Sequence, residues 1–359
     1  DPKINPLNGV SVDLKKFGEI LDDEQYSTFD VEILTNSKLL TVRKAITDIS
    51  RKANESDIIF FYYSGHGLLD VDKSLYLTCY DSEQKYLDAT CLDAGFVLSQ
   101  FKKSKCKSFI IIIDACHSGA MFNNVLGLPK GLFALTACDE DEVTMENEDG
   151  GVFTHIITTG LKSDFIDANR DGKITFSELF DYIIEENKKN KKYPGEPQKW
   201  EWNVSKDIAI FDSPKMVFMS YKRVQLDLVK KMSATLREAD IPTYMDLEKI
   251  RTGDNWRAEL ERTIINARVF LFIMDKEILF SEVSNWELET AFANNIPILP
   301  IQVEEVQTPA MFNAKYGHIN RLQFDVEHYE ENMEILIDHI KSLRISRPNE
   351  VTQMVEGTR

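Results

Sequence analysis

The sequence has no apolar run that approaches the roughly 18 residues that a helix needs to cross a membrane. Its first residues, Asp1-Pro2-Lys3, have neither the basic nor the apolar stretch of a secretory signal. We therefore expect no membrane span and no membrane partner. A phosphate-binding P-loop, a Gly-x-Gly-x-x-Gly fingerprint and internal repeats are also absent from the sequence.

Cysteine is scarce as well. There are five cysteines, an odd number, with no Cys-x-x-Cys pair, and all of them precede residue 140. This pattern argues against a disulfide scaffold and is typical of a reducing compartment, so we expect a cytoplasmic location. The five are Cys79, Cys91, Cys106, Cys116 and Cys138.

Positive charge is in deficit. The 42 Lys and Arg residues are outnumbered by 59 Asp and Glu, and the net charge of −17 repels phosphate backbones, so we expect no nucleic-acid partner. The hydrophobic fraction of 43% and the charged fraction of 28% are ordinary for a soluble globular protein. Because 359 residues exceed the size at which one hydrophobic core stops growing, we expect two domains.

The first half alternates strand and helix patterns. Two continuous apolar runs, residues 58–64 and 108–114, have the composition of strands that are covered on both faces of a parallel sheet. Apolar residues recur every three or four positions at 10–21 and 39–53, which predicts helices, and residues 31–34 predict a strand between them. This half is therefore predicted to be α/β.

The composition changes near residues 187–215, and we place a domain boundary at Ser213-Pro214. A second, smaller α/β pattern begins there, which predicts domains at 1–213 and 214–345 and a tail at 346–359. The remaining predicted strands are 207–211, 216–220, 242–245, 269–274 and 297–302, and the remaining predicted helices are 224–239, 256–267 and 286–294.

A histidine and a cysteine follow the two apolar runs of the first half. The first run ends in Tyr-Ser-Gly-His-Gly, which contains His66 and Gly67, and the second ends in Asp-Ala-Cys-His-Ser-Gly, which contains Cys116. Because the carboxyl ends of parallel strands line the functional crevice of an open sheet, we expect His66 and Cys116 to face each other.

This pair suits acyl transfer. A cysteine thiol is mostly protonated at neutral pH and needs a nearby base, which His66 would supply to Cys116. The amides of Gly67 and Cys116 are the candidate oxyanion donors, a contribution of about 3 kcal/mol. The alternative interpretation is structural, because a cysteine after an apolar strand is often a buried hydrophobe and a single histidine often only packs.

Together the two motifs resemble the caspase-like cysteine peptidases, specifically their metacaspase and orthocaspase branch. The resemblance extends over residues 4–212 and includes the segments PLNGVSVDLKKFGEIL and FDVEILTN. It implies a mostly parallel sheet covered on both faces and a His66–Cys116 dyad that requires no cofactor. The family opens with a hydrophobic strand before the PLNG-like segment, which this sequence lacks, so we expect further N-terminal residues in the full-length protein.

The resemblance also implies a specificity. Asp114 matches the family position that gives metacaspases an acidic S1 pocket, and Asp141, in the segment TACDEDEVT, resembles the other wall of that pocket. The implied substrates are proteins with Arg or Lys at P1, because a carboxylate binds a guanidinium strongly and selectively. An equally open alternative for Asp141 is a solvated acidic loop.

Residues 167–178 fit a twelve-residue calcium loop of the form Asp-x-Asn-x-Asp-Gly-x5-Glu. Gly172 takes the sharp turn, and a helical pattern follows at 178–186. The entering helix is short and no second calcium loop is visible, so a plain turn is the alternative to a Ca²⁺ site. The predicted ligands are Asp167, Asn169, Asp171, the carbonyl of Lys173, and Glu178.

The second domain resembles the Toll/interleukin-1 receptor (TIR) domain over residues 215–302, and less completely as far as residue 345. The resemblance implies a flavodoxin-like α/β fold that self-associates through the loop at 247–255. It rests on FMSY at 218–221, YMD at 244–246, a glycine loop with Gly253 and Trp256, and residues 281–287.

TIR domains that break down NAD⁺ use a glutamate on the helix before the last core strand. Glu287 matches this position, six residues after Ser281 and thirteen before Pro300, and Glu289 is the alternative. The carboxylate would stabilise the oxocarbenium-like charge that develops as the glycosidic bond breaks.

The resemblance further implies that Trp256 and Ser281 contact NAD⁺ or a nucleotide. The usual Trp-Cys after the serine is replaced here by Val283-Ser284, a departure from the enzymatic TIR pattern. The alternative interpretation makes Glu287 an exposed helix acid and Trp256 a packing residue.

These observations favour a cytoplasmic, caspase-like cysteine endopeptidase that cleaves after Arg or Lys. The fused TIR domain would regulate or assemble it in immune or cell-death signalling of an antiphage type. One alternative is an NAD⁺ glycohydrolase or cyclase with the peptidase as accessory, and another is a TIR scaffold in which neither site turns over.

Overall fold

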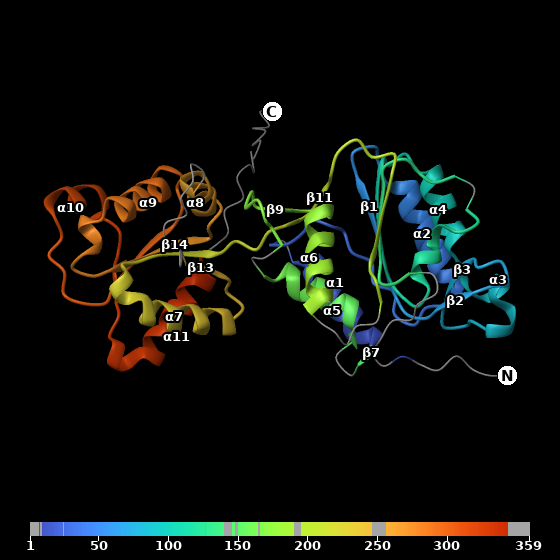
Figure 1. Cartoon of the computed structure of the whole chain (residues 1–359), viewed down its shortest axis with the longest axis horizontal. Helices are drawn as coiled ribbons and strands as arrows, with labels where there is room; N and C mark the ends of the chain where they lie inside the picture. The colour runs from blue at the N-terminus through green and yellow to red at the C-terminus, as the bar shows by residue number, and fades with distance from the viewer. Residues whose placement is uncertain are drawn as a thin grey trace, which may run out of the picture. The chain divides into compact units, whose positions relative to one another are not determined.

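Figure 1 shows the computed structural model of the chain. It describes residues 7, 9–23, 25–125, 127–139, 146–147, 150–163, 166–189, 195–245 and 256–343. The chain separates into two compact units. The first comprises Asp1–Ala168 and Lys173–Ser213, and the second Asn169–Gly172 and Pro214–Arg359. Among the described helices, none is long and apolar enough to cross a membrane.

A four-stranded sheet forms the centre of the first unit, in the order β1-β5-β6-β10. The strands β1 (Ile58–Ser64), β5 (Ser108–Asp114) and β6 (Leu132–Thr136) are parallel, and β10 (Gln198–Trp202) pairs antiparallel with β6. The register sets Ser64 opposite Asp114. The carboxyl ends of β1 and β5 therefore lie at one edge of the sheet.

Helices cover both faces of this sheet (Figure 1). The helices α1 (Val10–Asp22), α5 (Val152–Leu161) and α6 (Phe176–Lys189) share one core with alternate β5 residues such as Ile110 and Ile112. The helices α2 (Leu39–Lys52) and α4 (Ala94–Lys103) share the other core with Ile111 and Ile113. Burial on both faces explains why β5 is a continuous apolar run.

Shorter elements complete the first unit. A three-stranded sheet lies beyond β1 in the chain, and two strand pairs form further along. The strands are β2 (Gly67–Leu69), β3 (Leu75–Leu77), β4 (Leu92–Asp93), β7 (Glu146–Asn147), β8 (Gly150–Gly151), β9 (Lys173–Thr175) and β11 (Ala209–Asp212). The short helices are η1 (Gln84–Tyr86), α3 (Leu87–Thr90) and η2 (Ser118–Phe122).

One predicted strand is wrong. Residues 31–34 do not form a strand, because no neighbouring strand among the described residues pairs with them. The predicted helices at 10–21 and 39–53 match α1 and α2 to within one residue, and the two apolar runs match β1 and β5.

The second unit has a five-stranded parallel sheet in the order β13-β12-β14-β15-β16. The helices α7 and α11 pack on one face, and α8, α9 and α10 pack on the other. The strands are β12 (Val217–Ser220), β13 (Thr243–Met245), β14 (Val269–Met274), β15 (Ile298–Gln302) and β16 (Leu322–Gln323). The helices are η3 (Arg223–Gln225), α7 (Leu226–Glu238), α8 (Trp256–Ile265), η4 (Ile278–Phe280), α9 (Glu282–Ala293), α10 (Ala310–Tyr316), η5 (Val326–His328) and α11 (Tyr329–Ser342).

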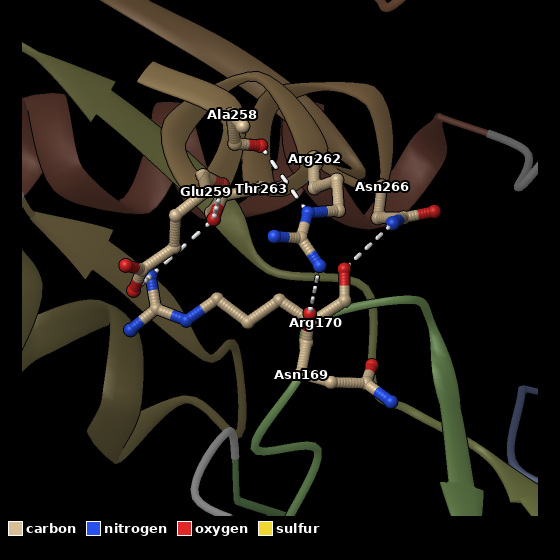
Figure 2. A network of polar contacts seen from close by, with 7 residues as sticks. All are labelled: Asn169, Arg170, Ala258, Glu259, Arg262, Thr263 and Asn266. Carbon is tan, nitrogen blue, oxygen red and sulfur yellow. Dashed lines mark hydrogen bonds and ion pairs between the residues drawn. The ribbon is translucent and has the colours of Figure 1, made fainter. Parts of the chain in front are cut away.

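The segment Asn169–Gly172 belongs to this second unit through polar contacts with α8 (Figure 2). The Arg170 guanidinium lies 3.6 Å from a Glu259 carboxylate oxygen and 3.3 Å from Thr263 Oγ1. The Asn266 side chain donates to the Arg170 carbonyl at 3.0 Å. The side chain and the main chain of Arg170 therefore both make contacts in this segment. The division based on sequence placed these four residues with the first domain.

Candidate catalytic site at the carboxyl edge of the first sheet

His66 and Cys116 each lie two residues beyond a paired strand end. Ser64 and Asp114 are opposite each other in the register of β1 and β5, and the Gly65 amide extends the pairing by donating to the Asp114 carbonyl at 3.1 Å. His66 and Cys116 therefore follow adjacent strands at the same edge. Their presence at this one edge agrees with the position that the sequence predicts for the dyad, whose catalytic role stays a prediction.

The main chain at His66 is fixed by its own neighbours. The His66 carbonyl accepts hydrogen bonds from the Thr78 amide at 3.1 Å and from the Tyr63 hydroxyl at 3.0 Å. A Cβ added to Gly67 would collide with the carbonyl oxygen of Cys116. A glycine is therefore required where the start of β2 touches the turn after β5.

Cys116 lies at a sharp turn after β5. The next residue, His117, has a φ of 59° in the left-handed region, which is uncommon for a residue with a side chain. The helix η2 begins directly afterwards at Ser118. This turn leaves Cys116 and His117 half-buried, between the buried residues Ala115 and Ser118.

The other four thiols occupy different environments, and no disulfide joins the five cysteines. Burial raises the pKa of Cys79 to about 11 and also raises the pKa of Cys138. The buried Cys106 thiol donates to the Asp57 carbonyl at 3.0 Å, and Cys91 is completely buried. The raised pKa makes Cys79 and Cys138 poor nucleophiles at neutral pH, and Cys91 and Cys106 are buried away from solvent.

Asp114 ends β5 and is buried, with 5% of its surface exposed. Its Oδ2 accepts from the Thr154 amide at 3.0 Å and from the Thr154 hydroxyl at 2.6 Å, in the first turn of α5. The N-terminus of a helix favours a negative charge at this position. Asp141 lies outside the described residues, so its predicted role in the pocket stays a prediction.

A second buried carboxylate, which the sequence analysis missed, lies beside the first. Asp13 on α1 accepts from the Gly151 amide at 3.0 Å and from the Ser64 hydroxyl at 2.9 Å. Oδ2 of Asp13 would lie 3.1 Å from a Cβ added to Gly151, and that Cβ would collide with Oδ2 of Asp114. We call Asp13 and Asp114 the acidic pair. Burial raises the pKa of Tyr62 well above its usual range, and the charges of Asp114 and Asp13 add to this shift.

A sequence signal for Asp13 did exist. The buried residues of α1 are Asp13, Phe17, Gly18, Ile20 and Leu21, so Asp13 stands one helical turn before Phe17 on the apolar stripe. An acidic side chain on such a stripe is rarely buried without a partner.

Several of the predicted calcium ligands make other contacts in the structure. Among the described residues, no three His, Cys, Asp or Glu side chains form a group that could hold a metal ion. Glu178 instead caps α6, where its Oε2 accepts from the Thr175 amide and hydroxyl at 3.0 Å. Oδ1 of Asn169 accepts from the Asp171 amide at 2.8 Å, and Lys173 pairs with Asp212. Calcium binding stays a prediction.

In the second unit, Glu287 is buried, so the interpretation of this residue as an exposed helix acid is wrong. It is 6% exposed, and its Oε2 accepts from the Ser220 hydroxyl at 2.6 Å. Ser220 is the last residue of β12, which the sequence analysis did not single out as a partner of Glu287. Glu289, the alternative, is exposed and pairs with Lys315 at 3.0 Å.

The two predicted ligand residues of this unit have structural partners. Trp256 begins α8, and its ring lies edge-on to Trp286 with centroids 6.4 Å apart. Ser281 caps α9, where its hydroxyl accepts from the Ser284 amide at 3.3 Å. The loop predicted to mediate self-association, 247–255, lies outside the described residues.

Comparison with known proteins agrees with both halves of this structure. The family model described as the caspase domain matches residues 2–207, and the one described as the TIR domain matches residues 217–337. A search of curated proteins found no match.

Solved structures with detectable similarity include a caspase and a TIR domain. Caspase-1 from Spodoptera frugiperda is 14% identical over 57% of this chain and 84% of its own, with a TM-score of 0.43. The TIR domain of the Toll-related receptor TRR-2 from Hydra magnipapillata is 16% identical over 35% of this chain and 97% of its own, with a TM-score of 0.30. Protein GSU0716 from Geobacter sulfurreducens is 13% identical over 56% of this chain and 86% of its own, with a TM-score of 0.40.

The caspase match covers more than half of the chain. The first unit has the mixed α/β fold, with its parallel strands covered by helices on both faces, and the second has a five-stranded parallel sheet that is also covered by helices on both faces. The chain therefore belongs to the caspase-domain family, and its caspase domain is followed by a TIR domain.

Proposed function

We propose that the first unit is a cysteine endopeptidase in which Cys116 is the nucleophile and His66 the general base. The observation that carries the proposal is the position of both residues at the carboxyl edge of paired strands, with Gly67 against the Cys116 carbonyl. Cys116 is also half-buried, whereas three of the other four cysteines are buried and burial raises the pKa of the fourth, Cys79.

In this mechanism the His66 imidazole takes the proton of the Cys116 thiol. The sulfur attacks the carbonyl carbon of the scissile peptide, and the electron pair of the C=O bond moves to its oxygen. Main-chain amides at Gly67 and Cys116 would donate to that oxyanion. The oxyanion then re-forms the carbonyl as the C–N bond breaks, and the imidazolium protonates the leaving amine. Water hydrolyses the resulting thioester to release the acid and the thiol.

The acidic pair supports a preference for Arg or Lys at P1. Asp13 and Asp114 place two carboxylates at the edge of the sheet that carries Cys116. A guanidinium forms stronger and more selective contacts with carboxylates than a neutral side chain does. Protein substrates with a basic P1 residue are therefore the proposed substrate class.

The test uses fluorogenic peptides with Arg, Lys or Asp at P1. Cys116→Ala and His66→Ala should each abolish turnover, because either loss removes the reactive sulfur or its base. Cys79→Ala is the matched control, since Cys79 is also half-buried, and it should retain activity. Full activity in Cys116→Ala, or equal cleavage after Asp, would contradict the proposal.

We propose that the TIR domain assembles chains and thereby brings peptidase units together. The domain assignment supports this role, since a caspase domain and a TIR domain occur in one chain. The proposed setting is immune or cell-death signalling in the cytoplasm, including defence against phage.

A second candidate function is NAD⁺ cleavage by the TIR domain. Its support is the burial of Glu287 at the carboxyl end of β12 and its hydrogen bond from Ser220. Glu287→Gln should then abolish NAD⁺ consumption, while Glu289→Gln, which changes an exposed glutamate of the same helix, should not. If the parent chain consumes no NAD⁺ at high concentration, this second function is contradicted.

A further inference from the structure

Cys138 is a buried residue at the same edge of the first sheet as the candidate nucleophile. It follows β6 by two residues, and the Ala137 amide between them donates to the Ile113 carbonyl of β5 at 3.0 Å. β5 and β6 are neighbouring parallel strands. Cys138 therefore follows β6 where Cys116 follows β5.

Hydrogen bonds join Cys138 to the residues on the two sides of Cys116. Before the nucleophile, the Cys138 thiol donates to the Ala115 carbonyl at 3.3 Å. After it, the Cys138 amide donates to the Ser118 hydroxyl at 3.2 Å, and the Gly119 amide donates to the Cys138 carbonyl at 3.0 Å. One residue thus contacts the turn at both of its ends.

The conformation of this turn depends on such contacts. His117 has a φ of 59°, which is unfavourable for a residue with a Cβ and persists only where the surroundings maintain it. Ala115, Ser118 and Cys138 each have 0% of their surface exposed. Water therefore cannot replace the hydrogen bonds among them.

The Ala115 carbonyl and the Cys116 amide belong to one peptide group. The group is planar, and in its trans form the C=O and the N–H point in opposite directions. A contact that fixes the Ala115 carbonyl therefore also fixes the direction of the Cys116 N–H. A carbonyl that accepts a hydrogen bond also polarises its own peptide group, which makes the N–H a stronger donor.

A thiol donates a hydrogen bond only while it carries its proton. Burial raises the pKa of Cys138 above its usual value, so the thiol stays protonated at neutral pH. The environment that makes Cys138 a poor nucleophile thus keeps it a donor.

We propose that Cys138 is a positioning residue of the peptidase, whose thiol orients the Ala115–Cys116 peptide group so that the Cys116 N–H points at the oxyanion. This role rests on the proposed peptidase function. An oxyanion donor acts where negative charge develops in the transition state, so its misalignment lowers kcat and leaves the binding of the substrate unchanged.

The first test measures kcat and KM of the full chain with a fluorogenic peptide that has Arg at P1. Cys138→Ala should lower kcat about tenfold, which is less than the hundredfold to thousandfold loss when a whole oxyanion donor is removed. KM should stay within about twofold, because the ground state does not use the oxyanion contact. Cys138→Ser keeps a donor at this position and should restore kcat to within about threefold of the parent.

Cys106→Ala is the matched control. The Cys106 thiol is also buried, and it donates to the carbonyls of Asp57 at 3.0 Å and Ser108 at 3.1 Å, at the opposite end of β5. This variant removes the same kind of bond away from the turn, so kcat should not change. Circular dichroism of all variants verifies that each is folded.

The second test does not depend on turnover. The chain is labelled with ¹⁵N at cysteine, and the Cys116 amide signal is followed by NMR. In Cys138→Ala this ¹⁵N signal should move upfield, because the peptide group loses the hydrogen bond that polarises it. The signal should return toward its parent position in Cys138→Ser and stay in place in Cys106→Ala.

Five results would each overturn the proposal. They are an unchanged kcat in Cys138→Ala, a loss that lies in KM, an equal loss in Cys106→Ala, no recovery in Cys138→Ser, and a Cys116 amide signal that does not move. A parent chain that cleaves no peptide contradicts the peptidase function alone, and the amide signal then decides whether Cys138 orients the peptide group.

Discussion

At the scale of single residues, the acidic pair is the feature with the most direct consequence for chemistry. Asp13 and Asp114 are 2% and 5% exposed, and an isolated buried carboxylate would be costly. Hydrogen bonds offset this cost for each carboxylate. Asp13 accepts from the Gly151 amide and the Ser64 hydroxyl, and Asp114 accepts from the amide and the hydroxyl of Thr154. These contacts hold both carboxylates at the edge of the sheet where β5 ends, two residues before the candidate nucleophile.

We expect Asp13→Asn and Asp114→Asn each to lower kcat/KM for an Arg substrate by about tenfold to a hundredfold, because each removes one charge-assisted contact. Cleavage of the same peptide with norleucine at P1 should change little. Asp22→Asn, an exposed change on the same helix as Asp13, is the control. A uniform loss for both peptides would indicate a structural role for the pair.

The thiol of Cys79 gives a prediction about pH. Burial raises its pKa to about 11, so at pH 8 its thiolate fraction is about 100-fold below that of a thiol with a pKa of about 9. Alkylation of Cys79 by iodoacetamide, followed by mass spectrometry, should therefore keep accelerating up to pH 11. A rate that levels off near pH 9 would contradict the raised pKa.

The same shift has a defined sign for stability. Below pH 9 the thiol is protonated in both the folded and the unfolded chain, so it contributes no pH dependence. Between pH 9 and 11 the unfolded chain loses the proton first, and the free energy of unfolding falls as the pH rises.

At the scale of elements, Glu178 at the start of α6 fits both the calcium-loop pattern and the capping-box pattern. Thr175 Oγ1 accepts from the Glu178 amide at 3.3 Å, and Glu178 accepts from the Thr175 amide at 3.0 Å. This is a reciprocal capping box, in which both side chains satisfy amides at the helix start. The twelfth position of the calcium-like loop is thus occupied in capping the helix.

We expect Glu178→Ala to lower the free energy of unfolding by about 1 kcal/mol without calcium, as the loss of a helix cap does. Urea titration combined with amide exchange of α6 measures this effect. Calorimetry with Ca²⁺ tests the loop separately: heat in the parent that disappears in Asp167→Ala would support the site. No heat in the parent would make the calcium prediction wrong and leave the capping prediction standing.

At the scale of the whole molecule, net charge opposes assembly. Copies that each carry −17 repel one another, and salt screens this repulsion. We therefore expect self-association to strengthen when the ionic strength rises from about 10 mM to about 150 mM, as the Debye length falls from about 30 Å to about 8 Å. Sedimentation equilibrium measures the association. Weaker association at the higher salt would indicate an interface built on opposite charges.

How much of the fold could be predicted depended on the element. Residues 58–64, 108–114 and 269–274 coincide with β1, β5 and β14, because long apolar β-rich runs carry their own signal. Residues 31–34 have similar composition but form no strand, since a strand needs a partner. The candidate dyad was visible because His66 and Cys116 stand in glycine-rich motifs at strand ends.

The sequence alone was sufficient to determine the two α/β halves and the edge at which His66 and Cys116 lie, because strand and helix periodicities are local and parallel strands end together. Only the tertiary structure decided which carboxylates join them. Asp13 and Gly151 are 138 positions apart, and their contact exists only once α1 and α5 pack on the same sheet.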